Sequence, residues 1–156
     1  MIAKINPRRI IFSRDTQDLC RRPYPGHPHG CPNFGRKPGC PPRQPLIDQV
    51  LDFSRPVYVI WVELNLTSWV KRMAGLHPKL KTYAQRANLR YWQPGLRSQL
   101  NSIVSRATRD GLIEIAVGPE AHGVNASALM RLVGVKLEWP PKRLVCKVVL
   151  AGFTHK

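Results

Sequence analysis

The sequence predicts a single small domain of mixed helix and strand, either α/β or α+β, in which helices pack on a three- to five-stranded sheet. The chain has 156 residues, 43% of them hydrophobic, which suits one domain with one core. Apolar runs typical of strands alternate with stretches whose apolar residues recur at helical spacing. Apart from a short apolar run at 10–12, residues 1–45 show neither pattern and are rich in Cys, Pro and Gly. We therefore expect one domain, 1–156, made of this N-terminal loop segment and a core over 46–156.

The first half of the core contains a predicted strand between helical segments. Residues 46–53 have helical spacing after a proline, which suits a helix start. The run Val-Tyr-Val-Ile-Trp-Val-Glu-Leu at 57–64 is almost continuously apolar and rich in β-branched and aromatic residues, which predicts a buried central strand. Helical spacing returns over 68–88, where a glycine and a proline interrupt it, so we expect one helix or two short ones. Nearer the N-terminus, residues 10–12 predict an edge strand or a packing tail.

The second half repeats the alternation. Apolar residues over 96–107 predict a helix that stops at Asp110-Gly111. Residues 112–117 follow as a strand, and after a short loop a helix begins at Asn125, a good N-cap residue. The remaining predictions are a strand or connection over 135–139 and a closing strand over 144–151.

The loop from Gly118 to Gly123 is a candidate site. Connections of the lengths found here permit parallel pairing, and in open parallel sheets ligands bind beyond the carboxyl ends of the strands. This loop leaves the carboxyl end of a predicted strand and leads into a helix. Its Glu120 is a candidate catalytic residue, acting as a general acid or base. The alternative is that Glu120 only caps backbone donors of the following helix.

The segment from Cys20 to Pro42 holds three of the four cysteines and two of the five histidines. Its prolines and glycines exclude a helix, and it has few apolar side chains to bury. Something else must offset the entropy of ordering it, and a bound metal would do so. The candidate metal ligands are Cys20, Cys31, Cys40 and His29. The alternative is a proline-rich loop with free thiols, while Cys146, in a predicted strand, is interpreted as a small buried hydrophobe.

The spacing of the cysteines bears on the metal. Ten residues separate Cys20 from Cys31 and eight separate Cys31 from Cys40, whereas compact zinc sites use two to four. Cys31 and Cys40 each precede a proline, and a Cys-Pro step also closes the ferredoxin run that holds an iron–sulfur cluster. Three thiolates would leave one cluster iron for another ligand or a substrate. An iron–sulfur cluster is our first expectation, and zinc, completed by His27 or His29, is the alternative.

Two motifs carry a family resemblance: Gly-Cys-Pro-Asn-Phe-Gly-Arg-Lys-Pro-Gly-Cys-Pro-Pro at 30–42 and Gly-Pro-Glu-Ala-His-Gly at 118–123. In this order they resemble an uncharacterised bacterial and archaeal family of small predicted metal-binding proteins. The resemblance spans roughly Cys20 to Gly134 and implies that Cys31 and Cys40 are ligands, together with Cys20. It also implies that the Pro-Glu-Ala loop lies near them. The family has a further close-spaced cysteine pair that this chain lacks, and it implies no settled activity.

The formal net charge of +16 predicts attraction to polyanions. No acidic residue lies between Glu63 and Asp110, where nine Lys and Arg residues are interleaved with aromatic ones. Basic side chains can neutralise phosphates, and aromatic faces can stack on unpaired bases. The candidate nucleic-acid contacts are Arg86, Arg90 and Arg97. The alternative is a solvated basic face whose tryptophans are buried.

The sequence also bears on location and activity. No apolar run is long enough to span a membrane, and the N-terminal residues lack the apolar region of a signal peptide, so we expect a cytoplasmic protein with no membrane contact. Phosphate-binding glycine loops, Gly-x-Ser-x-Gly and His-Glu-x-x-His motifs are missing, so the sequence does not decide whether the protein is an enzyme. Three hypotheses follow: an iron–sulfur protein acting on an anionic or nucleic-acid substrate, a nucleic-acid-binding module with a structural zinc, and a non-enzymatic interaction protein.

Overall fold

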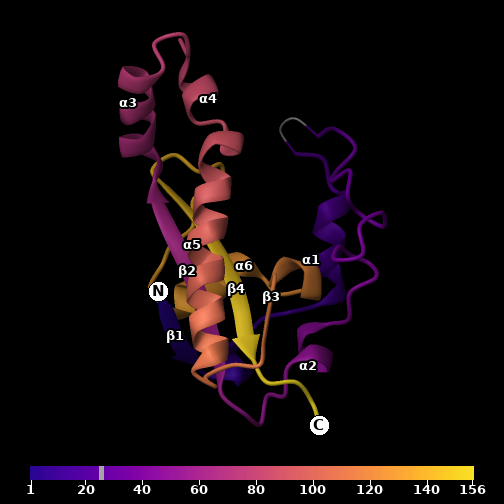
Figure 1. The fold of residues 1–156 in the computed structure, drawn as a ribbon. Coiled ribbons are helices and arrows are strands. Elements are labelled where there is room, and N and C mark those ends of the chain that lie inside the picture. The colour runs from indigo at the N-terminus through magenta and orange to yellow at the C-terminus, as the bar shows by residue number, and fades with distance from the viewer. Residues whose placement is uncertain (25–26) are drawn as a thin grey trace.

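A four-stranded sheet in the order β1-β2-β4-β3 organises the computed structural model, which describes residues 1–24 and 27–156 (Figure 1). The strands are β1 (Ile2–Ile5), β2 (Val57–Asn65), β3 (Ile115–Val117) and β4 (Leu144–Gly152). All three neighbouring pairs are antiparallel. The fold is therefore α+β, and the parallel pairing that the crossover lengths permitted does not occur among these strands.

Within the described residues, six helices and three 3-10 turns accompany the sheet. The helices are α1 (Arg14–Asp18), α2 (Ile47–Val50), α3 (Leu66–Leu76), α4 (Tyr83–Arg86), α5 (Leu89–Arg109) and α6 (Ala126–Leu132), and the turns are η1 (Pro7–Arg9), η2 (Leu19–Arg21) and η3 (Glu120–His122). The helix expected over 46–53 is only the short α2, and the segment over 68–88 forms two helices. The long helix begins earlier than expected, at Leu89, because the Asn88 side chain accepts the Arg90 N–H and caps it.

The start of α6 and the ends of α5 and α6 lie where the capping residues predicted them. Asn125 caps α6, because its side-chain oxygen accepts the Ala128 N–H at 2.9 Å. Gly111 and Gly134, which follow α5 and α6, have φ angles of +71° and +79°. These are left-handed conformations that suit glycine and end a helix.

The sheet is covered on both faces. On one face α5 lies across the strands (Figure 1) and buries Leu96, Leu100 and Ala107 together with residues of α3. On the other face α2, α6 and the N-terminal residues pack around Leu51, Val59 and other buried side chains. Successive residues of β2 point to opposite faces of the sheet. Because both faces are covered, the residues on both are buried, which explains the almost continuous apolar sequence of β2.

The structure also decides between the expectations for three other segments. The edge strands of this sheet are β1 and β3, and the sequence did not predict β1. Residues 10–12 form a packing segment, in which Ile10 is buried and Phe12 makes a single bridge to Val124. Residues 135–139 are a connection without strand structure. No helix in the described part of the chain has the length and apolarity needed to cross a membrane.

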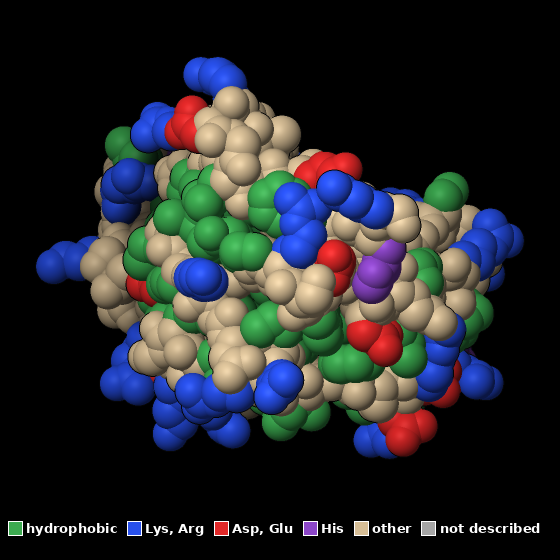
Figure 2. Space-filling model, turned by 90° about the horizontal axis from the view of Figure 1, so that it is seen from below, with side chains coloured by type: hydrophobic (Ala, Val, Ile, Leu, Met, Phe, Trp, Pro, Cys, Tyr) green, Lys and Arg blue, Asp and Glu red, His purple; other side chains and the backbone are tan. Residues whose placement is uncertain are grey.

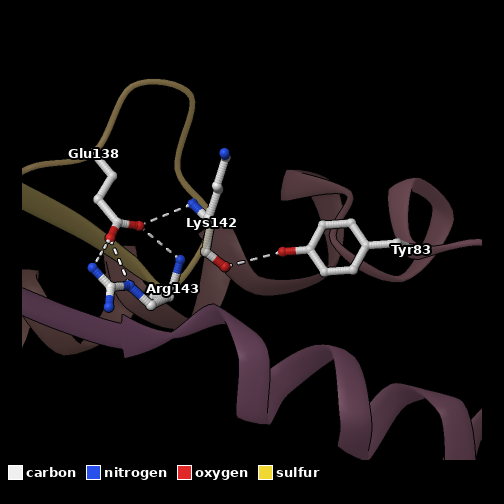
Figure 3. A network of polar contacts seen from close by, with 4 residues as sticks. All are labelled: Tyr83, Glu138, Lys142 and Arg143. Carbon is white, nitrogen blue, oxygen red and sulfur yellow. Dashed lines mark hydrogen bonds and ion pairs between the residues drawn. The ribbon is translucent and has the colours of Figure 1, made fainter.

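A polar network centred on Glu138 holds this connection where it enters β4 (Figure 3). The Glu138 carboxylate accepts the backbone N–H groups of Lys142 and Arg143 at 3.2 and 2.8 Å. It also forms an ion pair with the Arg143 guanidinium at 2.8 Å. The Tyr83 hydroxyl donates to the Lys142 carbonyl at 3.1 Å and so attaches α4 to the same turn.

We expect replacement of Glu138 by glutamine to destabilise the protein at neutral pH but not in strong acid. The donors of Arg143 and Lys142 lower the pKa of Glu138 from an ordinary value of 4.5 to about 2. A lowered folded-state pKa stabilises the fold above pH 4.5, and this stabilisation is lost as the pH falls towards 2. Urea unfolding of Glu138→Gln and the unmodified protein at pH 7 and pH 2 measures the difference. An equal difference at both pH values would contradict the assignment.

Candidate functional site

The three clustered cysteines lie on an arm beside the sheet, visible as the column at the right of Figure 1. We call residues 14–24 and 27–45 the cysteine arm. It begins with α1 and η2 and continues as turns. The Cys31 N–H donates to the Cys20 carbonyl at 2.7 Å, and the Gly35 N–H donates to the Pro41 carbonyl at 2.7 Å. These two bonds fold the arm back on itself, the first beside Cys20 and the second beside Cys40.

Gly30 makes the first of these contacts possible. It has a φ angle of +79°, and a Cβ atom there would lie 2.6 Å from the Arg21 carbonyl oxygen and 2.8 Å from the Cys20 carbonyl oxygen. Any side chain would push these segments apart. The residue preceding Cys31 therefore has to be glycine for the backbone to approach Cys20 so closely.

The thiols of the arm influence one another electrostatically. All four cysteines are free and partly buried. Partial burial raises the pKa of Cys20, and the charges of Cys31, Cys40 and Glu120 raise it further. Cys20, Cys31 and Glu120 also line one cavity. Within the described residues, however, no three Cys, His, Asp or Glu side chains converge into a group that could hold a metal ion.

The two histidines of the arm line a hollow in its surface. His27 and His29 line a hollow of about 600 Å³ together with Cys31 and the arginines Arg21 and Arg36. His29 is exposed, whereas His27 is partly buried and its ring lies 4.6 Å from that of Tyr24. Of the three candidate cysteine ligands, only Cys31 borders this hollow. His29 therefore shares the hollow with one of the expected cysteine ligands and not with all three.

The arm is attached at its base to the loop that carries Glu120. The Ser13 N–H donates to the Gly123 carbonyl at 2.8 Å, and the Asn125 N–H donates to the Ile11 carbonyl at 2.9 Å. The other end of the arm is held by His122, whose Nδ1–H donates to the Pro45 carbonyl at 2.8 Å. His122 is buried. It therefore acts as a structural link between the Glu120 loop and the end of the arm.

Gln17 completes this attachment, and nothing in the sequence pointed to it. Its side chain is 2% exposed. The Nε2 group donates to the carbonyls of Ala121 at 2.8 Å and Gln44 at 2.9 Å, while Oε1 accepts from Arg14 at 2.9 Å. One glutamine thus joins the start of the arm, its end and the Glu120 loop. A lone glutamine in a short helix has no sequence signature for such a role.

Glu120 lies between two cavities. The larger, of about 540 Å³, also has Cys20, Tyr24 and Cys31 in its lining, so the carboxyl and two of the expected ligands face one space. The smaller, of about 140 Å³, is lined by Cys146, Trp92 and other side chains of β4 and the preceding connection. Both cavities are bordered by Trp139, which is 73% exposed and whose ring N–H donates to the Ser127 hydroxyl at 3.0 Å.

The environment of Glu120 favours its neutral form. The residue is exposed at the mouth of the cavities, but the protein atoms packed near its carboxyl remove part of its hydration, and this desolvation raises the pKa of the carboxyl. Its own backbone N–H and the charge of Lys147 act in the opposite direction and are smaller effects. Glu120 does not cap α6, because Asn125 does so. A carboxyl with a raised pKa beside a cavity is suited to proton transfer.

The basic residues expected to contact nucleic acid do not form one group. Arg86 is partly buried, and its Nε donates to the Leu80 carbonyl at 2.7 Å. The Arg90 guanidinium lies 4.9 Å from the Tyr91 ring and donates to its hydroxyl. Only Arg97 projects from the middle of α5 without such a contact among the described residues. Two tryptophans of this region use their ring N–H groups internally: Trp69 donates to Arg86 and Trp92 to Ala87.

Comparisons of this chain with protein-family models, with curated proteins and with solved structures found no match.

Proposed function

We propose that the protein is a cytoplasmic metal-binding protein that holds an iron–sulfur cluster through the thiolates of Cys20, Cys31 and Cys40. The observation that carries the proposal is the shared cavity: Cys20 and Cys31 are joined by a backbone hydrogen bond and face the same space as Glu120. Cys40 lies close enough for its charge to act on Cys20. Soft thiolate ligands suit iron–sulfur clusters and zinc.

The construction of the arm supports a bound metal. Gln17, Gly30 and Pro41 are the only buried residues among those described in the arm, so hydrophobic burial contributes little to its order. Three neighbouring thiolates repel one another unless a cation neutralises them. Metal binding would provide the missing stabilisation and would lower the thiol pKa values as it did so. To bind one metal centre, the three thiols would have to move closer together than they lie here. The turns between Cys31 and Pro41 permit such a movement, because few side chains in these turns are packed against the rest of the protein.

The cavity favours an iron–sulfur cluster over zinc. Three thiolates fill only three positions, and the space of about 540 Å³ beside Cys20 and Cys31 leaves room for a substrate at the remaining one. Glu120 would face that substrate as a general acid or base. A structural zinc would instead need a fourth protein ligand, such as His29, which borders the other hollow.

Metal analysis of protein purified without air tests the proposal. We expect iron and sulfide in a ratio of about 1:1, with the visible absorption of a thiolate-bound cluster. Cys40→Ser should bind iron at least about tenfold more weakly. Removing a group that only orients a metal ligand already lowers metal affinity about tenfold or more, and removing the ligand itself should cost no less. Cys146→Ser is the matched control and should keep the iron, since Cys146 lies on β4 outside the arm.

The outcomes separate the candidate metals. Stoichiometric zinc without colour, lost in Cys40→Ser and kept in Cys146→Ser, would replace the cluster by a structural zinc. Protein that contains neither metal when isolated without air, and that takes up neither iron nor zinc on reconstitution, would refute metal binding by the arm.

A further inference from the structure

The outward face of α5 carries a stripe of polar and basic side chains. It lines a shallow surface groove of about 650 Å³ formed by this helix alone. We call its residues the α5 stripe: Pro94, Arg97, Ser98, Asn101, Ser102, Ser105, Arg106 and Arg109. They recur at intervals of three and four and lie opposite Leu96, Leu100 and Ala107, which are buried against the sheet. The stripe is therefore the part of α5 that is free to meet a partner.

The three arginines of the stripe lack partners within the protein. Among the residues that the structure describes, none of Arg97, Arg106 and Arg109 makes an ion pair or a side-chain hydrogen bond, and the one ion pair present joins Glu138 and Arg143. Within α5 there is no acidic residue, and the C-cap Asp110 makes no ion pair with these arginines among the described residues. The guanidinium groups are thus left to solvent or to an external anion.

The stripe has the dimensions and donors of a phosphate-binding surface. The rise from Arg97 to Arg109 along the helix is roughly 18 Å, at about 1.5 Å per residue. Between the arginines lie hydroxyl and amide side chains, and Ser, Asn and Arg all donate hydrogen bonds to phosphate oxygens in protein–nucleic acid complexes. A helix with side chains is about 10–12 Å across, close to the major-groove width of about 12 Å in B-DNA.

We propose that the α5 stripe binds the phosphate backbone of a nucleic-acid duplex. A duplex fits better than a single strand because single strands are bound largely by stacking on aromatic side chains, and the stripe has none. Of the two aromatic residues that precede it on α5, Trp92 is partly buried and donates its ring N–H to Ala87, and the exposed Tyr91 ring has the Arg90 guanidinium over it at 4.9 Å. This inference concerns a different surface from the cysteine arm and does not depend on the bound metal.

Charge elsewhere on the molecule has to be separated from the stripe. Figure 2 shows Lys and Arg side chains around the margin of the face seen from below, and the net charge of +16 attracts any polyanion. A matched control must therefore remove the same charge from another surface. Arg8, Arg9 and Arg131 are exposed and lie outside α5, on η1 and α6.

The experiment compares two triple variants by fluorescence anisotropy with a labelled DNA duplex over a series of salt concentrations. Because each phosphate contact contributes about 0.9 to the slope of log K against log salt, Arg97→Ala/Arg106→Ala/Arg109→Ala should reduce that slope by roughly 3. Affinity at low salt should fall by about tenfold or more. Arg8→Ala/Arg9→Ala/Arg131→Ala should change both much less. Ser102→Glu, which places one negative charge in the stripe, should weaken binding without removing an arginine.

Each other outcome counts against the proposal. Equal losses in the two triple variants would show general polyanion binding by the whole charge. An unchanged slope in the α5 variant, with its helical circular dichroism intact, would place binding elsewhere. Tighter binding of a single strand than of the duplex would overturn the choice of partner.

Discussion

Replacing Gly123 by alanine is expected to lower the free energy of unfolding by about 3 kcal/mol or more, since a left-handed backbone and a steric clash combine there. Gly123 has a φ angle of +77°, and a Cβ atom would lie 2.5 Å from the Ser13 carbonyl oxygen and 2.7 Å from a Leu46 methyl group. The Ser13 backbone cannot move away without losing its hydrogen bond to the Gly123 carbonyl. Urea unfolding followed by tryptophan fluorescence measures the change.

Gly111→Ala is the matched control for this prediction. Gly111 has a similar φ angle of +71°, but no atom lies within 4 Å of the position its Cβ would take. Alanine there should cost only the backbone term, about 1 kcal/mol. If both substitutions have the same effect, the close approach between the arm and the Glu120 loop does not contribute, and the clash argument fails.

Gln17→Ala is expected to destabilise the protein by about 2–3 kcal/mol, because it removes the side-chain donor of the Ala121 carbonyl, leaves the Gln44 carbonyl with Arg14 as its only side-chain donor, and opens a small cavity. The carbonyls belong to Ala121 and Gln44, and the side chain that serves them is almost fully buried. The loss should fall first on the attachment of the cysteine arm. Amide hydrogen exchange should therefore become faster in the arm than in β2 or β4.

The control for Gln17→Ala is Gln99→Ala on the exposed face of α5. The Gln99 side chain is exposed and makes no hydrogen bond to another described residue, so its loss should change the free energy of unfolding by no more than about 0.5 kcal/mol. Equal effects of the two substitutions, or uniform acceleration of hydrogen exchange across the sheet, would contradict the role given to Gln17.

The elements that the sequence predicted well are those with local signals. The β-branched run of β2 and the capped helix α6 needed only neighbouring residues to be recognised. The strand pairing was not predictable in the same way. β4 pairs antiparallel with β2 from Tyr58 opposite Ala151 to Asn65 opposite Leu144, and a connection of this length allows either direction. The edge strand β1 is only four residues long, too short for its alternation to stand out.

In the candidate site, too, the residues with a local sequence signal were predicted and those that depend on long-range contacts were not. Composition alone marked Cys20, Cys31 and Cys40, because clustered cysteines among prolines and glycines have few other uses. The nearness of Glu120 followed only from the family resemblance. Gln17 is 104 residues from Ala121 along the chain, and contacts at such separation leave no local pattern. The α5 stripe could have been predicted from the sequence, since helical spacing from the buried Leu96 and Leu100 places Arg106 and Arg109 on the outward face.

The strand order also constrains how the chain can fold during synthesis. β4 is the last of the four strands along the chain, yet it lies between β2 and β3 and is the partner of both. Until it leaves the ribosome, only β1 and β2 can pair, and β2 exposes an unpaired edge. Long-range pairing of this kind is slow because a large loop must close first. The sheet therefore cannot be completed before β4, from Leu144 to Gly152, has been translated.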